Sequence, residues 1–162
     1  MPIFQIPKTL KTKSIKPVER SKTSTKNTTS PPDNPEDLER LAMEAMADLS
    51  AKFPAWVSGD VQKIKQLLAE ASGIFGDERT EFIHANIYPK VHDLKGQGTT
   101  FGYPLITDIG SHMCQLLTSK DSFTSDDLLV LKNDTKMMET VLWKKLKGDG
   151  GAKGAEILEK LK

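Results

Sequence analysis

Apolar residues recur at every third or fourth position through most of this chain, and this spacing limits its fold more than any other feature. From residue 34 onward, successive segments each carry such a stripe, whereas the alternating Val-rich runs typical of β-strands are missing. A repeat of about 3.6 residues places the apolar side chains on one face of an α-helix. The sequence therefore predicts an all-α protein.

Caps, prolines and glycines divide the stripes into separate helices. Pro54 should end the first helix and Pro89 should kink the third, because proline lacks the N–H that an interior helical position donates. Thr124 followed by Asp127 is an acidic form of the capping box that starts a helix. We expect five helices, at about residues 34–52, 56–73, 77–97, 104–117 and 124–147.

Four long amphipathic helices with short connections should pack as an antiparallel four-helix bundle, capped by an additional N-terminal helix. The apolar stripe of that first helix should be buried, and Cys114 should be a small core residue. The tryptophans and most methionines fall at helical spacing, and we expect them in the core as well. The stripe consists of Leu38, Leu41, Ala45, Met46 and Leu49. The tryptophans and the other methionines expected in the core are Met43, Trp56, Met113, Met137, Met138 and Trp143.

The N-terminal segment differs in composition from the rest. Residues 1–32 have seven Lys or Arg against one Glu, a net charge of +6; since the whole chain carries +1, the remainder carries −5. A polar, charged segment without apolar periodicity is typical of disorder. We therefore expect a disordered basic tail at 1–33, a helical bundle at 34–150 and a short C-terminal tail at 151–162, which either adds a final turn of helix or frays. The basic tail could attract an acidic partner, but we favour a solvated tail.

The compartment is predicted from cysteine usage and hydropathy. Cys114 is the only cysteine, so the sequence offers no intrachain disulfide and no C-x-x-C pair. Apolar runs are far shorter than the ~20 residues of a membrane span, and residues 1–10 have no signal-peptide hydrophobic region. No aromatic residues are interleaved with the lysines in the way that single-strand nucleic-acid binding requires. We expect a cytoplasmic monomer without membrane or nucleic-acid partners.

His92 is the main candidate for chemistry. On a helix of about 100° per residue, one face carries Ile83, Ile87, Val91 and Leu94. The centre of that face lies roughly 140° from His92. The histidine should therefore face water. The residues within about 60° of it on the same wheel should form its surroundings. They are Ala85, Tyr88, Pro89, Lys95, Gly96 and Thr99.

An exposed imidazole, largely neutral at pH 7, offers a lone pair for nucleophilic attack, and phosphorus is a suitable electrophile. Lys95 lies one turn along the same face, where its ammonium group would neutralise phosphoryl oxygens. Gly96 would let the loops of a partner approach closely. Gln97 could hydrogen-bond near the site or cap the helix end. Such a site is half of an active site, and the partner supplies the other half.

A metal site formed by His84, His92, His112 and Cys114 is a further possibility. No tight H-x-x-x-H or C-x-x-C pair supports it, so we expect no metal site and interpret His112 as a residue at the edge of the core.

The string His92-x-Leu94-Lys95-Gly96, followed by Gly102, resembles the signature of histidine-containing phosphotransfer (HPt) domains. The glycines and the lysine have the spacing of that signature, and the resemblance extends in helix order over about residues 56–147. The longer string HDLKGQGTTFGYPL is similar to a bacterial subgroup of HPt proteins. Asp93 departs from the pattern, since the family often has a small or neutral residue after the histidine.

The resemblance implies a phosphorelay intermediate, which accepts a phosphoryl group from the aspartyl-phosphate of one receiver domain and delivers it to another. His92 would be the acceptor through Nε2, supported by Lys95 and Gly96, and Gly102 would belong to the partner-binding region. The partners would be response-regulator receiver domains and a hybrid histidine kinase. The protein would have no cofactor and no ATP-dependent kinase activity of its own, since the receiver supplies Mg²⁺. The absence of a Walker-type glycine loop agrees with this.

An alternative function from a different class is a non-catalytic helical protein-interaction module, in which His92 has no chemical role.

Overall fold

The computed structural model describes residues 34–162, and all regular elements in this part are helical, which confirms the all-α prediction for it. The predicted disordered tail at 1–33 lies outside the described residues. The helices are α1 (Pro35–Ala71), α2 (Gly76–Asn86), α3 (Tyr88–Gly98), the 3₁₀ helix η1 (Thr99–Phe101), α4 (Pro104–Thr118), α5 (Ser125–Trp143) and α6 (Gly151–Lys160). Within this part of the chain, none of them is long and apolar enough to cross a membrane.

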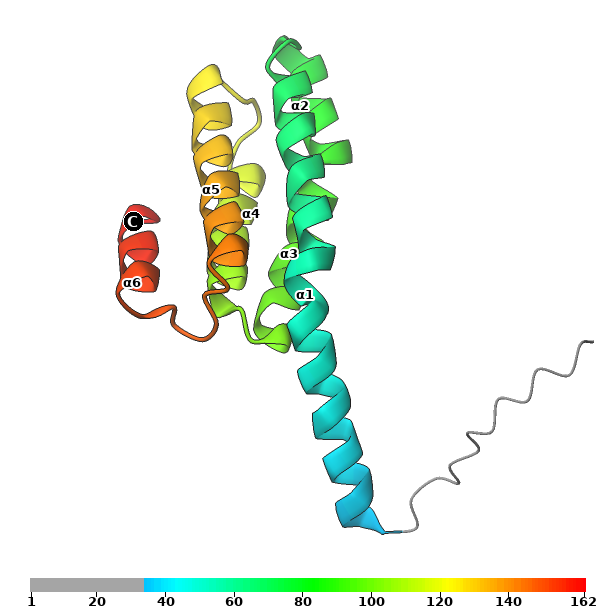
Figure 1. Cartoon of the computed structure of the whole chain (residues 1–162). Helices are drawn as coiled ribbons and strands as arrows, with labels where there is room; N and C mark the ends of the chain where they lie inside the picture. Colours follow the sequence, from blue (N-terminus) through cyan, green and yellow to red (C-terminus); the bar gives the residue numbers. More distant parts are fainter. Residues whose placement is uncertain (1–33) are drawn as a thin grey trace, which may run out of the picture. The chain divides into compact units, whose positions relative to one another are not determined.

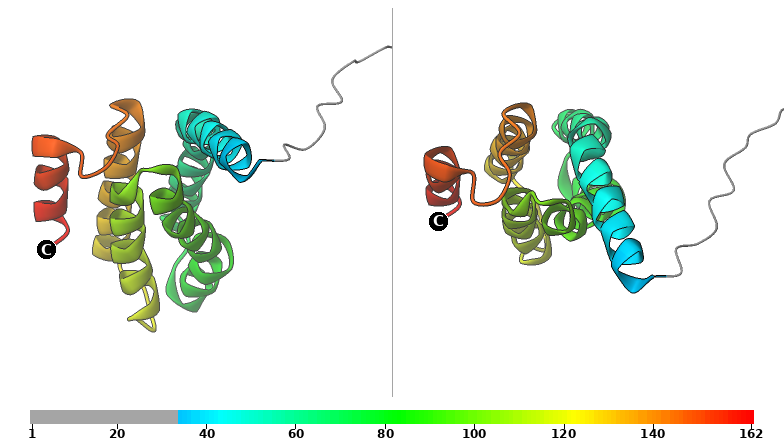
Figure 2. Two further views of the ribbon diagram at one scale, coloured as in Figure 1. Left: turned by 90° about the horizontal axis from the view of Figure 1, so that it is seen from below. Right: turned by 60° about the horizontal axis from the view of Figure 1, so that its bottom comes forward.

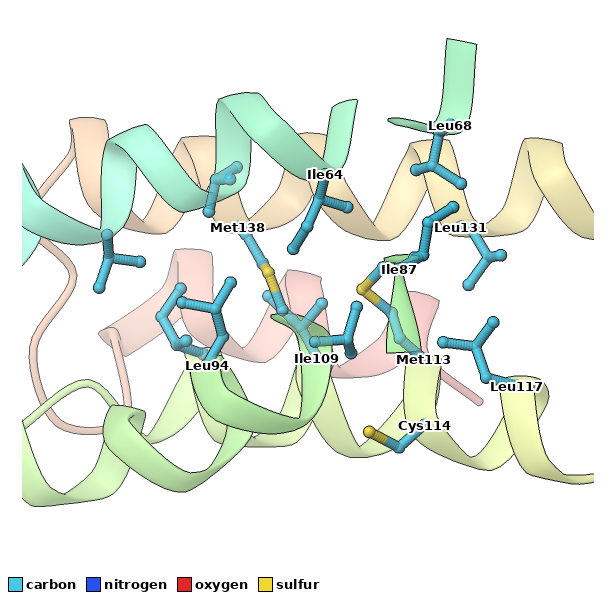
Figure 3. Packing of buried hydrophobic residues seen from close by; sticks show 14 of the residues in the cluster. Ile64, Leu68, Ile87, Leu94, Ile109, Met113, Cys114, Leu117, Leu131 and Met138 are labelled. Atoms are coloured by element: carbon cyan, nitrogen blue, oxygen red, sulfur yellow. The ribbon is translucent and has the colours of Figure 1, made fainter. Parts of the chain in front are cut away.

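The helices pack side by side around one hydrophobic core. α3 packs against α4, α4 against α5, and α5 against α1, while α6 lies on the outer side of α4, away from α1 (Figure 1). Figure 3 shows how side chains from α1, α3, α4 and α5 meet between the helices. The labelled members of the core are Ile64, Leu68, Ile87, Leu94, Ile109, Met113, Cys114, Leu117, Leu131 and Met138.

Several local predictions are confirmed. Ile83, Val91 and Leu94 are almost completely buried, as the helical pattern predicted, and Cys114 is a core residue. Pro104 is at the start of α4. Thr124 forms a full capping box with Asp127, in which each side chain bonds to the backbone N–H of the other residue.

The predicted break at Pro54 is wrong, because α1 continues through it as one helix of 37 residues. Proline removes one backbone donor, so the carbonyl of Ser50 loses its usual partner. Phe53 and Val57, on either side of the proline, are both buried in the core. Their packing offsets the loss of that hydrogen bond, and most helical stability in proteins comes from such packing.

The predicted burial of the first stripe is also wrong. We call residues 35–52 of α1 the arm; its side chains are exposed apart from the half-buried Ser50. The arm extends past the ends of the neighbouring helices, so they do not cover it (Figures 1 and 2). The exposed stripe comprises Leu38, Leu41, Ala45, Met46 and Leu49, and Met43 beside it is exposed as well.

The predicted third helix is divided in two. α2 ends at Asn86 and α3 begins at Tyr88, with Ile87 between them. Pro89 is therefore the second residue of α3, where a missing N–H costs nothing because it would have no intrahelical partner. The expected kink at Pro89 is thus a helix boundary.

The C-terminal part of the chain also differs from the prediction. α5 ends at Trp143, which is 81% exposed, and Trp56 is 51% exposed, so neither tryptophan is a core residue. Residues 151–160 form α6, in which Ile157 is buried. Of the two expectations for this segment, a final turn of helix or a frayed end, the structure shows helix, and it is longer than one turn.

Candidate functional site

His92 lies in the middle of α3 and is exposed, as the helical pattern predicted. Tyr88, one turn earlier, places its half-buried ring 5.9 Å from the imidazole, measured between centroids, with an angle of 42° between the planes. Among residues 34–162, the His92 ring makes no hydrogen bond or ion pair. Its nitrogens are therefore open to a partner from outside this part of the chain.

Lys95 is half-buried one turn after His92, and its stem lies against the backbone of α4. A Cβ atom added at Gly110 would come within 2.9 Å of the Lys95 Cβ, so only glycine permits this close approach. The ammonium charge also acts on α4: burial raises the pKa of the Cys114 thiol, and Lys95 opposes the rise. The stem of Lys95 is thus supported by α4, while one face of the residue remains exposed.

Two glycines at the end of α3 have different surroundings. A Cβ atom at Gly96 would meet nothing within 4 Å, so this position is an open part of the surface. A Cβ atom at Gly98 would lie 2.6 Å from Thr107 Oγ1 and 2.8 Å from the Tyr103 carbonyl oxygen. Gly96 therefore leaves space for a partner, and Gly98 allows α3 to approach α4.

The Thr107 hydroxyl of α4 holds the end of α3. It donates to the Lys95 carbonyl oxygen at 2.9 Å and accepts from the Thr99 backbone N–H at 2.9 Å. The Thr99 hydroxyl lies 3.0 Å from the same oxygen. Thr107, Gly98 and Gly110 were not predicted from the sequence; the Gly96-x-Gly98 pair was the signal that could have identified Gly98.

The turn after α3 joins the site to α1. Gly102 has a φ of +82°, in the left-handed region that favours glycine, and its N–H donates to the Thr99 carbonyl. Phe101 stacks on Phe53 of α1 at 4.9 Å between ring centroids. The Ser50 hydroxyl donates to the Phe101 carbonyl oxygen at 2.6 Å. The contacts of Phe101 hold the end of η1 against α1.

Most of the residues predicted to surround His92 lie on α3 or directly after it. Pro89, Gln97 and Thr99 are exposed on α3 or directly after it, and Tyr88 contacts the imidazole. Ala85 is exposed on α2, so the boundary at Ile87 separates it from α3.

The other histidines have structural contacts. The His84 ring lies edge-on to Phe123, with centroids 5.6 Å apart. His112 Nδ1 lies 2.8 Å from Oδ2 of the buried Asp134. Burial raises the pKa of Asp134, and the bond to His112 opposes the rise. Within residues 34–162, no group of three or more His, Cys, Asp or Glu side chains could hold a metal ion.

Comparison of the chain with models of protein families, with curated proteins and with solved structures gave no significant match.

Proposed function

We propose that this protein is a histidine phosphotransfer protein that relays phosphoryl groups between the aspartates of receiver domains. The observation that carries the proposal is the arrangement on α3: His92 is exposed, and the next turn carries Lys95 and an unobstructed Gly96. A phosphoryl carrier needs such a nucleophile on an accessible and rigid surface.

We further propose that the fold is an antiparallel four-helix bundle with an additional N-terminal helical segment. The bundle would consist of the buried half of α1, α2 together with α3, α4 and α5. Figure 1 supports this arrangement, since these elements lie side by side, and α1 packs on α5 while α3 packs on α4. The proposed location is the cytoplasm, where receiver domains act.

The proposed step is a direct transfer from an aspartyl-phosphate. The lone pair of His92 Nε2 attacks phosphorus, a P–N bond forms, and the bond between phosphorus and the aspartyl oxygen breaks. The receiver regains its carboxylate, and the proton on Nδ1 stays on the ring. Transfer to a second receiver reverses the step. No nucleotide or oxidant takes part.

Lys95 and Gly96 support this chemistry in different ways. The negative charge on the phosphoryl oxygens is stabilised by nearby cations. Gly110 lets α4 pack against the stem of Lys95. The Lys95 side chain has therefore lost part of its conformational entropy before the phosphoryl group arrives, which lowers the entropic cost of positioning the ammonium group. Gly96 gives the loops of the receiver room to approach. The receiver supplies Mg²⁺, so the carrier needs no cofactor.

The surface around His92 favours a protein partner over a small substrate. A hollow of about 550 Å³ lies between α1 and α5, lined by residues such as Pro54, Ser58 and Trp143, and His92 does not line it. Small-molecule sites are typically concave. A receiver domain, including that of a hybrid histidine kinase, could instead cover the exposed residues Pro89, Gln97 and Gly102.

The test is transfer of labelled phosphate from a panel of receivers charged with acetyl phosphate. Wild type should gain label that is acid-labile and alkali-stable, and His92→Gln should gain none. His84→Gln is the matched control, because His84 is also exposed and lies one helix earlier. This variant should accept label as wild type does.

Failure of every receiver in the host's full set to label wild type would contradict the proposal, as would equal labelling of His92→Gln. The chain would then be a helical interaction module, for which the exposed arm of α1 is the supporting observation.

A further inference from the structure

Two neighbouring hollows lie between α1 and α5. They measure about 550 Å³ and 370 Å³, and the two helices that form them lie side by side (Figure 1). Glu139 lines both hollows, so they adjoin one another. We call the two together the α1–α5 groove. His92 lines neither hollow, so the groove is separate from the surface proposed for phosphotransfer.

Each wall of the groove is a single line of side chains. Spacings of four, three and four residues place successive side chains one above the other along a helix. The wall of α5 consists of Lys132, Lys136, Glu139 and Trp143, and that of α1 consists of Ser58, Gln62, Lys65 and Ala69. Each wall spans roughly 16 Å, or about three helical turns. The groove is therefore straight and long enough for a partner helix.

The groove is positively charged. Four lysines and one glutamate line it, a net charge of +3, whereas residues 33–162 as a whole carry −5. The glutamate, Glu139, is already bonded within the chain, because its Oε1 atom accepts from Lys65 Nζ at 2.9 Å and from Gln62 Nε2 at 2.6 Å. The single acid of the groove therefore does not neutralise the other three lysines.

Those three lysines are Lys132, Lys136 and Lys145. They are exposed, and none of them forms an ion pair among residues 34–162. The acids of the same stretch of α1, Asp60 and Glu70, lie at least about 110° around the helix from its wall, so they face elsewhere. The charge of the groove is thus open to a partner of opposite sign.

Acids beyond the two ends of the groove do not offset this charge. Asp126 precedes the wall of α5 by six residues, which is roughly 9 Å along the helix. Asp127 and Asp134 are buried and bonded to bases outside the groove. Asp48, on the arm, is paired with Lys52. Because most of the folded chain is acidic, an acidic partner would be attracted to this groove and repelled elsewhere.

Lys145 occupies a position where the backbone favours glycine. Its φ is +51°, in the left-handed region, directly after the end of α5. Its N–H donates to the Leu142 carbonyl at 3.2 Å, and the Leu146 N–H donates to the Val141 carbonyl at 2.9 Å. These two bonds form a Schellman motif, in which glycine is the usual residue at this position. The lysine is thus unfavourable for the backbone, and what its side chain adds is a positive charge at the rim of the groove.

The end of the groove near Lys145 is also apolar. Trp143 is 81% exposed, the highest value among the large apolar side chains in the described part of the chain. It lines the larger hollow together with Pro54, Ala55 and Leu142. Tryptophans are enriched among the residues that anchor protein interfaces. This end of the groove therefore suits a large apolar side chain.

We propose that the α1–α5 groove binds an acidic helical segment of another protein. An apolar side chain of that helix enters the larger hollow beside Trp143. The acids of the helix lie about two turns away, opposite Lys136, because Lys136 precedes Trp143 by seven positions. A helix suits the groove better than single-stranded nucleic acid, whose successive bases stack on several aromatic rings, since Trp143 is the one aromatic residue that lines it. The proposal does not rest on phosphotransfer by His92.

Fluorescence anisotropy of labelled synthetic peptides, titrated with the full chain, tests the proposal. The probe is a stapled helix of about 14 residues, long enough to span the groove, with leucines at one end and glutamates two turns away. Two matched peptides carry lysine in place of the glutamates or alanine in place of the leucines. Wild type should bind the first peptide at least tenfold more tightly than either of the others.

A matched pair of variants locates the binding. Lys136→Glu should weaken binding of the first peptide at least tenfold, because it puts an acid opposite the glutamates. Lys63→Glu makes the same change of charge at an exposed position about 130° around α1 from its wall, and should keep the affinity within about twofold. Equal weakening by both variants would overturn the proposal, since the attraction would then come from net charge.

Lys145→Gly separates binding from folding. Glycine adopts the left-handed conformation freely, so the variant should unfold at a temperature a few degrees higher than wild type. Its affinity for the first peptide should nevertheless fall at least threefold. Unchanged affinity would overturn the proposal. So would a lysine or alanine peptide that binds as tightly as the first, or a single-stranded oligonucleotide that binds more tightly and loses affinity with Lys136→Glu.

Discussion

The two halves of α1 belong to one helix and have similar apolar spacing, yet their surroundings are opposite. Residues 53–71 bury seven side chains in the core, whereas the arm, residues 35–52, buries none. The sequence pattern is nearly the same in both halves. The difference shows that amphipathic spacing predicts an apolar face on a helix, but does not predict whether neighbouring helices of the same chain cover that face.

The same contrast recurs over a shorter distance on α3. Its inner face is fixed by Val91 and Leu94 in the core and by Gly98 against α4. Its outer face carries His92 and Gly96, which have open space around them. The inner face of the helix is therefore held by its neighbours while its outer face stays accessible, as the proposed phosphotransfer would require.

The largest expected effect comes from truncating one leucine in each half of α1. Leu68 is fully buried, so Leu68→Ala should lower the free energy of unfolding by about 2–5 kcal/mol. Leu41→Ala, on the arm, should lower it by less than about 1 kcal/mol, because this side chain is exposed. Urea unfolding followed by circular dichroism measures both. Equal losses would mean that the arm packs within its own chain.

A smaller effect is expected from adding one methyl group to each of two glycines of α3. Gly98→Ala would push Cβ against Thr107 and the Tyr103 carbonyl, and should cost about 1–3 kcal/mol of unfolding free energy. Gly96→Ala meets no atom and should stabilise the exposed helix by about 0.5–1 kcal/mol. Thermal unfolding distinguishes the signs. A stabilising Gly98→Ala would contradict the close contact between α3 and α4.

The smallest expected effect concerns pH and the buried start of α5. Burial favours a higher pKa for Asp127, but hydrogen bonds from Lys120 and Thr124 lower its pKa below the ordinary value. Because the folded pKa is the lower one, this carboxylate stabilises the fold above about pH 4, and the contribution is lost as pH falls through the lowered pKa. Asp127→Asn should cost about 0.5–2 kcal/mol at pH 7.

That cost should shrink as the pH of the unfolding experiment is lowered from about 5 to 2. Asp126→Asn is the control, since Asp126 is an exposed acid in the same turn; its cost should be smaller than that of Asp127→Asn. A cost for Asp127→Asn that does not change with pH would contradict the role of its charge.

The sequence predicted those features that depend on neighbouring residues. The capping box at Thr124, the start of α4 at Pro104 and the buried face around Val91 are local patterns, and all three are confirmed. The exposure of His92 followed from the same spacing.

Features that depend on distant contacts were not predicted. Pro54 should have ended a helix, but core packing on both sides of it keeps α1 continuous. Thr107 and Gly110 matter only because α4 lies against α3, and nothing in their own sequence neighbourhood indicates this. The packing of Ile157 in α6 likewise depends on helices far away in the sequence.

The most direct test of the central claim is to identify the phosphorylated atom. The chain, uniformly labelled with ¹⁵N, would be phosphorylated by a charged receiver, and its histidine side chains would be examined by NMR for coupling between ³¹P and ¹⁵N. The account predicts coupling to Nε2 of one histidine, absent from His92→Gln and present in His84→Gln. Coupling of ³¹P to a nitrogen of His84 or His112 would contradict it. A phosphorylated chain in which no histidine nitrogen couples to ³¹P would also contradict it.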